Sequence, residues 1–141
     1  MKASFALEGF DGLERALTEM PKQLQKRVIK KGIVAMGRHF VVHMRSTLLQ
    51  KTDGQGDTAR SIKNSSGGLN TQFVRISSPV WHLLEYGTDH RFHRSGHYTG
   101  QIRDGKFSFV RPTLFTQAEP AKANFEARVR VELEKIGNAY L

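Results

Sequence analysis

The feature that most constrains this fold is a long helical pattern over residues 21–50. Apolar side chains recur there at three- and four-residue steps, which places them along one side of a helix. Pro21 opens the pattern, and proline suits a first helical position because its φ is already close to helical. The spacing predicts one long amphipathic helix. Its predicted core stripe consists of Ile29, Ile33, Met36, Phe40, Met44 and Leu48.

Two glycines, Gly32 and Gly37, fall inside this pattern. Each costs about 1 kcal/mol relative to alanine in a helix interior. We therefore expect them to serve either close packing against a neighbouring element or a bend.

The predicted helix is also strongly basic, because every charged residue between Lys22 and Lys51 is Lys or Arg. The whole chain has 22 Lys and Arg against 13 Asp and Glu, a formal net charge of +9. This balance predicts attraction to anionic partners, either nucleic acid or acidic protein surfaces.

The segments before the long helix predict two short elements. Residues 4–9 are typical of a strand, and residues 10–20 of a first helix with Leu13, Leu17 and Met20 on one face. Asp11 and Glu14 have the spacing of a capping box at its start.

After the long helix, the pattern predicts a small sheet and a closing helix. Residues 60–66 and 71–78 are expected to form strands, and 79–88 either a strand or a short helical turn. Residues 51–59 and 89–105 are predicted to form loops because of their Gly, Asp and Thr content. A last strand over 106–110 is expected to end at Pro112.

The closing helix is predicted to begin near Thr116 or Pro120 and to end with Gly137 as its C-cap. Its predicted apolar stripe consists of Phe125, Val129, Leu133 and Ile136.

These elements predict an α+β fold, with a long N-terminal helix and a C-terminal helix packed on a small, mostly antiparallel β-sheet. A chain of 141 residues suits one domain, residues 1–141. No run of apolar residues is long enough for a transmembrane helix, so no membrane association is expected.

Three histidines, His90, His93 and His97, have the spacing that would place them on one face of a helix, where they could hold zinc. Gly96 and Gly100 argue against a continuous helix there. We interpret the segment as a solvated basic loop and expect no metal or cofactor. A metal-dependent hydrolase built on this loop stays open as one alternative.

Other signs of catalysis are weak. The chain has no cysteine, its serines lack a nucleophile-elbow context, and no glycine-rich phosphate loop is present. We therefore expect that the protein is not an enzyme.

A small basic nucleic-acid-binding module is the main alternative function. The sequence has few aromatic residues near its basic helix and no named DNA-binding motif. The side chains that would track phosphates are Lys22, Lys26, Arg27, Lys30, Lys31, Arg38 and Arg45.

The order of motifs along the chain resembles a family of phage tail-completion proteins, also described as minor tail components or head–tail joining proteins. The opening "FALEGFDGLERALTEMPKQLQKRVIKKGIVAMGRHF" is similar to the start of that family. "DTARSI", Asp57 to Ile62, follows, with Ala59 where a glycine is usual. "LLEYGT", Leu83 to Thr88, is the closest match. "FVRPTLFTQA", Phe109 to Ala118, corresponds in part, because its later proline and alanine are shifted or replaced.

This resemblance implies a structural role in the virion of a long-tailed phage, at the neck or proximal end of the tail. It implies an α+β fold and a homo-oligomeric ring, six-fold to match the tail tube. The implied partners are a head-side neck or connector protein and a tail terminator or tail tube protein. As a further hypothesis, the positive charge of the chain faces the DNA in the lumen and makes non-specific contact with it. The protein would be made in the host cytoplasm.

Within this frame, "HLLEYGT" is interpreted as a corner. Gly87 would supply a backbone conformation that a Cβ resists, while Leu83, Leu84 and Tyr86 anchor the corner in the core or in a subunit contact.

Glu85 is expected to pair with an arginine, either Arg111 of the same chain or a basic helix residue of a neighbour. An exposed glutamate worth less than about 1 kcal/mol is the alternative. We expect Glu85→Ala to lower ring formation more than monomer stability. The predicted interface residues are Glu85, Tyr86, Gly87, Thr88, Arg111, Lys30 and Arg38.

Overall fold

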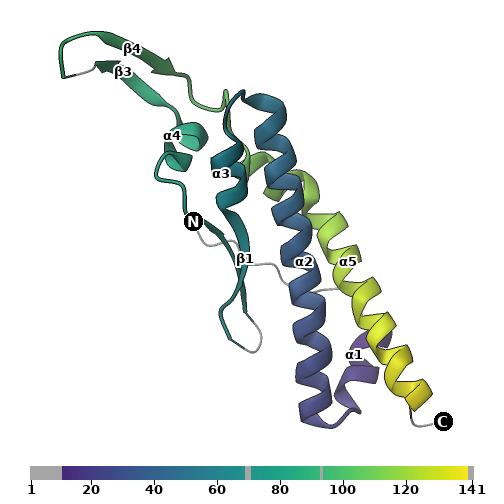
Figure 1. Cartoon of the computed structure of the whole chain (residues 1–141). Coiled ribbons are helices and arrows are strands. Elements are labelled where there is room, and N and C mark those ends of the chain that lie inside the picture. Colours follow the sequence, from purple (N-terminus) through teal and green to yellow (C-terminus); the bar gives the residue numbers. More distant parts are fainter. Residues whose placement is uncertain (1–10, 69–70, 93, 140–141) are drawn as a thin grey trace.

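The computed structural model describes residues 11–68, 71–92 and 94–139 (Figure 1). The predicted strand over 4–9 and the capping side chains of Asp11 and Glu14 lie outside the described part. The fold is α+β, as predicted. Its elements are α1 (Asp11–Thr18), α2 (Lys22–Lys51), α3 (Gly56–Ser61), β1 (Ile62–Ser66), β2 (Gln72–Ile76), α4 (Trp81–Tyr86), β3 (Thr88–Phe92), β4 (Tyr98–Ile102) and α5 (Val110–Ala139).

The two long helices, α2 and α5, lie side by side and form an elongated body (Figure 1). Each is 30 residues long. Helix α2 follows Pro21 directly, which confirms the predicted start. The short α1 lies near the far end of the pair, where Leu13 and Leu17 pack against a cluster of Val28, Phe125 and Val129.

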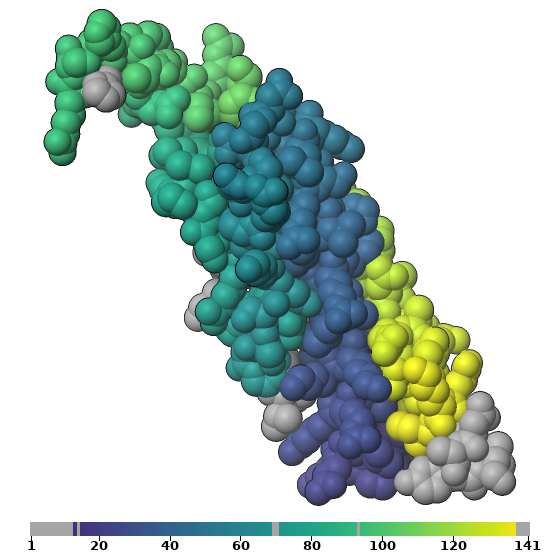
Figure 2. Space-filling model, in the orientation of Figure 1, coloured from purple at the N-terminus to yellow at the C-terminus, as the bar shows by residue number. Residues whose placement is uncertain are grey.

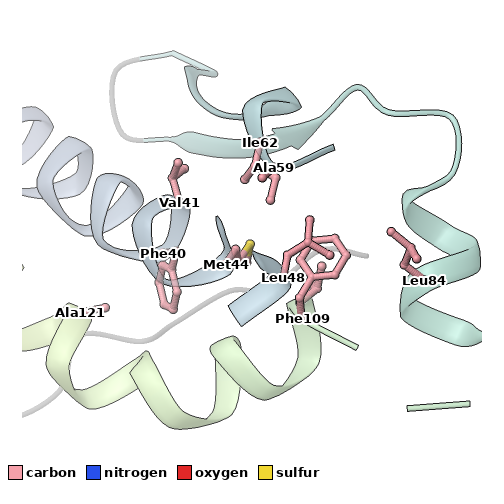
Figure 3. Close-up of a cluster of buried hydrophobic side chains, with 10 residues drawn as sticks. Phe40, Val41, Met44, Leu48, Ala59, Ile62, Leu84, Phe109 and Ala121 are labelled. Carbon is pink, nitrogen blue, oxygen red and sulfur yellow. The ribbon is translucent and has the colours of Figure 1, made fainter. Parts of the chain in front are cut away.

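The main core lies at the other end of this body, between α2, the start of α5 and the elements that connect them (Figure 3). The second half of the predicted α2 stripe is buried as expected, whereas Ile29, Ile33 and Met36 are only half-buried. In that first half, Val28 and Gly32 are the buried residues. The main core includes Phe40, Val41, Met44, Leu48, Ala59, Ile62, Leu84, Phe109 and Ala121.

Close packing explains both glycines of α2. A Cβ at Gly32 would lie 2.7 Å from the ring of Phe125 and 2.8 Å from Val129, so α5 can approach only because no side chain is present. A Cβ at Gly37 would occupy the space of the Asn64 side-chain amide, which donates a hydrogen bond to the Val34 carbonyl at 3.1 Å. The close-packing alternative is therefore confirmed for both positions.

Strands β1 and β2 form an antiparallel hairpin that packs on α2. Ile62 pairs with Ile76, and Ser66 pairs with Gln72. The two predicted strands are confirmed, but the predicted loop over 51–59 is only partly a loop, because α3 begins within it. Arg45 of α2 helps to hold this turn, since its guanidinium donates to the carbonyls of Ala59 and Ile62.

Strands β3 and β4 form a second antiparallel hairpin, in place of the loop predicted over 89–105. We call this hairpin the arm. It is not hydrogen-bonded to the first hairpin, so the described residues contain two separate two-stranded sheets. The arm projects away from the helical body, beyond α4 (Figures 1 and 2).

The predicted start of the closing helix is wrong. Residues 106–110 do not form a strand, and α5 begins at Val110, so Pro112 lies in its first turn instead of ending a strand. Proline is tolerated there because the first N–H groups of a helix have no intrahelical partner. Pro120 lies inside the helix, and Gly137 is not its C-cap because α5 continues to Ala139. The stripe is confirmed: Phe125 and Val129 are buried, and Leu133 and Ile136 pack against them.

Candidate functional site

Glu85 is the central residue of the predicted corner, and its side chain is fully buried. It lies in α4, so the helical-turn alternative for residues 79–88 is the one that the structure adopts. Leu84 beside it is buried in the main core, as predicted, whereas Tyr86 is 48% exposed. A carboxylate in such a place is unfavourable unless its oxygens are hydrogen-bonded or paired with a cation.

The Glu85 carboxylate binds the N-terminus of α5. Oε2 accepts hydrogen bonds from the backbone N–H groups of Phe109 and Val110, both at 2.9 Å, and Oε1 accepts one from Arg111 at 2.9 Å. The next residue, Pro112, has no N–H. Every N–H group that the start of an α-helix normally leaves unsatisfied is thus either bound to Glu85 or absent. The positive end of the helix dipole also favours a carboxylate at this place.

Two side chains complete the binding of this carboxylate. The Ser108 hydroxyl donates to Oε1 at 2.9 Å, and the Arg111 Nε donates to the same oxygen at 3.0 Å. Of the alternatives for Glu85, the structure therefore adopts the pair with Arg111 of the same chain. We call this arrangement of Glu85, Ser108 and the start of α5 the joint.

Arg111 ties the joint to its surroundings. Its Nη2 donates to the Glu85 carbonyl at 2.6 Å and to the Asp104 carboxylate at 2.9 Å. Its guanidinium carbon lies 5.1 Å from the ring centroid of Tyr86, within the range of a cation–π contact. One arginine thus links the end of α4, the segment after β4 and the start of α5.

The electrostatics of the joint favour an ionised carboxylate. Burial by itself raises the pKa of Glu85, but the hydrogen bonds from the backbone of Val110, Arg111 and Phe109 and from Ser108 outweigh it. The pKa of Glu85 is therefore below its ordinary value. The charge is present at neutral pH and is satisfied within the chain.

Gly87 and Thr88 set the base of the arm. Gly87 has a φ of 79°, and a Cβ there would lie 2.6 Å from the Ile102 carbonyl oxygen, so the predicted need for glycine is confirmed. The Thr88 hydroxyl accepts a hydrogen bond from the Ile102 N–H at 3.1 Å. The first residue of β3 is thereby fixed to the last residue of β4.

The arm exposes aromatic side chains. Phe92 is 64% exposed and Tyr98 is 56% exposed, and their ring centroids lie 5.5 Å apart. His90 shares a hydrogen bond of 3.0 Å with the Tyr98 hydroxyl. A two-stranded hairpin has little core of its own, so adjacent exposed rings on it are suited to contact with another molecule.

The zinc site that the histidine spacing left open as an alternative is not formed by the described residues. Over 11–68, 71–92 and 94–139, no group of three His, Cys, Asp or Glu side chains is placed to hold a metal ion. His93 lies outside these ranges.

Helix α2 offers fewer free positive charges than the sequence indicates, because some of its Lys and Arg side chains bind groups of the same chain. Arg45 binds backbone carbonyls, and Lys31 donates to the buried carboxylate of Glu132 at 2.7 Å. The hydrogen bond from Lys31 lowers the pKa of Glu132. Lys30 and Arg38 are exposed, and the described part of the chain gives neither of them an ion-pair partner.

The predicted interface residues thus fall into two groups. The first comprises Glu85 to Thr88 with Arg111, at the joint and the base of the arm; the second comprises Lys30 and Arg38, on α2. Glu85 itself needs a correction, because a buried side chain that is bound within its own chain has no surface to offer a neighbouring subunit. We therefore expect Glu85→Ala to destabilise the fold of the single chain, and not to act only on ring formation.

Sequence reasoning missed Ser108 of the joint and Asp104, which pairs with Arg111. Pro112 carried the signal that would have revealed the joint, because proline marks the first turn of a helix as well as the end of a strand. An α5 starting at Val110 leaves its first N–H groups in need of an acceptor.

Among the described residues, no helix combines the length and apolar character needed to cross a bilayer. No protein-family model matches the chain, and neither a curated protein nor a solved structure is detectably similar to it.

Proposed function

We propose that this chain is a structural protein of the neck or proximal tail of a long-tailed bacteriophage, which completes the tail and joins it to the head as an oligomeric ring. The proposal begins from the ordered motifs that resemble tail-completion proteins. It is an assembly role, without a catalytic step.

One observation carries the proposal furthest. The two later motifs of the resemblance, Leu83 to Thr88 and Phe109 to Ala118, meet in the joint through Glu85 and Arg111. The residues between these motifs form the arm, which extends from the body and exposes Phe92 and Tyr98. A projecting hairpin on a fixed base is suited to reach a neighbouring subunit, and head-to-tail contacts form a ring when the rotation from one subunit to the next closes.

Electron microscopy of a phage lysate tests this role. A phage that encodes this chain is grown with a nonsense mutation in the gene, and the same phage is grown in a suppressing host as the control. We expect filled heads and full-length tails lying apart in the first lysate and joined particles in the second. Joined, normal particles in both lysates would refute the role in joining.

The second candidate function is non-specific nucleic-acid binding, which the exposed Lys30 and Arg38 of α2 favour. A phosphate-binding surface loses affinity steeply as salt rises, with a slope set by the number of phosphates neutralised. Salt titration of DNA binding by the purified protein separates the two functions. A steep slope together with normal particles in the mutant lysate would favour this alternative.

A further inference from the structure

An open groove of about 750 Å³ lies between α2 and α5. Its α2 side runs from Arg27 to His43, which corresponds to about 24 Å of helix at 1.5 Å per residue. Its α5 side includes Asn124, Ala127 and Val131. The groove is therefore long and follows the helix axes.

Basic and apolar side chains alternate along the α2 side. Lys30, Val34, Arg38 and Val42 are spaced four residues apart, and all of them line the groove. Residues four apart lie on the same face of a helix. Val42 is 60% exposed, and Val131 on the opposite wall is 41% exposed. The groove thus offers aliphatic contact and positive charge at regular intervals.

We propose that an acidic amphipathic helix of a partner protein docks in this groove. The space between two packed helices accepts a third helix, whose side-chain ridges fit between theirs. The valines would cover the apolar face of such a helix, and Lys30 and Arg38 would pair with carboxylates at its edges. Ala127 on the α5 wall is small enough to let the backbones approach.

The charge of the groove argues against a second copy docking through the same face, because Lys30 and Arg38 would then face like charges. Its apolar character argues against nucleic acid, since valines give bases no stacking platform. His39, which also lines the groove, is bound through both ring nitrogens: it shares hydrogen bonds with Gln117 at 2.9 Å and with Asn124 at 2.7 Å.

This inference goes beyond the proposed function and does not depend on it, because the groove is a property of the single chain. Its test uses the purified full chain and fluorescence anisotropy. The probe is a labelled helical peptide of about sixteen Glu, Ala and Leu residues, long enough to fill the groove, with all its leucines on one face. The comparison probes are a scrambled peptide of the same composition and a labelled oligothymidylate of about sixteen nucleotides.

We expect the amphipathic peptide to bind at least about tenfold more tightly than the scrambled one, which corresponds to about 1.4 kcal/mol. Lys30→Glu with Arg38→Glu should weaken binding by about tenfold or more, and Val42→Asn with Val131→Asn should do the same. The matched control is Lys63→Glu with Arg75→Glu, which makes the same charge change on the exposed β1–β2 hairpin. This control should leave binding unchanged.

Equal affinity for the amphipathic and the scrambled peptide would overturn the proposal. An equal loss of affinity for the amphipathic peptide in Lys30→Glu with Arg38→Glu and in the hairpin control would also overturn it. Preferential binding of the oligothymidylate, lost on Lys30→Glu with Arg38→Glu, would assign the groove to nucleic acid instead. Circular dichroism of each variant shows that the helices are intact. Failure here leaves the phage lysate experiment unaffected, so the two proposals can fail separately.

Discussion

Arg111 binds the Glu85 carboxylate with both its main chain and its side chain: the Oε1 atom accepts the Arg111 N–H at 2.9 Å and the Arg111 Nε at 3.0 Å. This relationship joins α4 to α5 across 26 positions of the sequence. The arm leaves the body directly after α4 and returns shortly before α5. Glu85 therefore fixes both the start of the last helix and the base from which the arm projects.

Replacing Glu85 should destabilise the fold itself. Glu85→Ala leaves the N–H groups of Phe109 and Val110 without their acceptor and removes the carboxylate partner of the Arg111 side chain. Leaving a buried donor without its acceptor costs about 1–3 kcal/mol, so the loss should be well above that for a surface ion pair. Urea unfolding followed by circular dichroism measures the loss.

The control for this change is Glu119→Ala. Glu119 is exposed on α5 and pairs only with Lys122, three residues away, among the described contacts. Its replacement should change the free energy of unfolding by less than about 0.5 kcal/mol. Similar small effects at both positions would contradict the role given to Glu85.

Acid should weaken the joint. The folded-state pKa of Glu85 is below its ordinary value, so the carboxylate stabilises the fold above the unfolded-state pKa of about 4.3. That stabilisation is lost as the pH falls through the lower, folded-state pKa. We expect the unfolding temperature to fall as the pH is lowered below about 5. Thermal unfolding at a series of pH values measures this drop.

Glu85→Gln isolates this contribution, because glutamine does not titrate while the other carboxylates stay in place. The difference in stability between the original protein and the variant should be largest near neutral pH and should shrink as the pH is lowered. Parallel pH profiles for the two proteins would show that Glu85 does not titrate differently on folding.

Two glycine replacements should have opposite effects. Gly32→Ala places a methyl group against the Phe125 ring and Val129, and overpacking of about 1–3 kcal/mol should exceed the gain of about 1 kcal/mol in helix propensity. Gly137→Ala meets open space inside α5 and should stabilise by up to about 1 kcal/mol. Chemical denaturation of both variants tests the close approach of α2 and α5. Stabilisation by both replacements would be incompatible with that approach.

The arm should matter for assembly and not for the stability of the single chain. Phe92→Ser with Tyr98→Ser removes two exposed rings, so the free energy of unfolding should change by less than about 0.5 kcal/mol. Under the proposed function, phage complemented with this double variant should give fewer joined particles.

Phe115→Ser is the control for the arm, because Phe115 is 86% exposed and lies in α5, outside the arm. Particle counts by electron microscopy compare the two variants. Full joining by the Phe92 and Tyr98 variant would exclude the arm as the contact.

Much of the fold could be predicted from periodic patterns. The helix after Pro21 and the stripe of α5 were expected because each repeats a local preference over several residues. The strands of the β1–β2 hairpin were expected from their residue types on either side of a glycine-containing turn. The arm was missed because its residues are mostly polar and the segment contains Gly96 and Gly100, a composition typical of loops. The start of α5 was missed because Pro112 fits two local structures equally well.

By itself, the sequence determined that the chain contains two long amphipathic helices and an excess of positive charge. It also indicated that Glu85 and Gly87 form a corner and that Arg111 was one possible partner. Only the tertiary structure decided that Glu85 is buried and that it binds the first turn of α5. The physical reason is that helical patterns follow from neighbours in sequence, whereas the partner of a buried carboxylate depends on which distant N–H groups the folded chain brings to it.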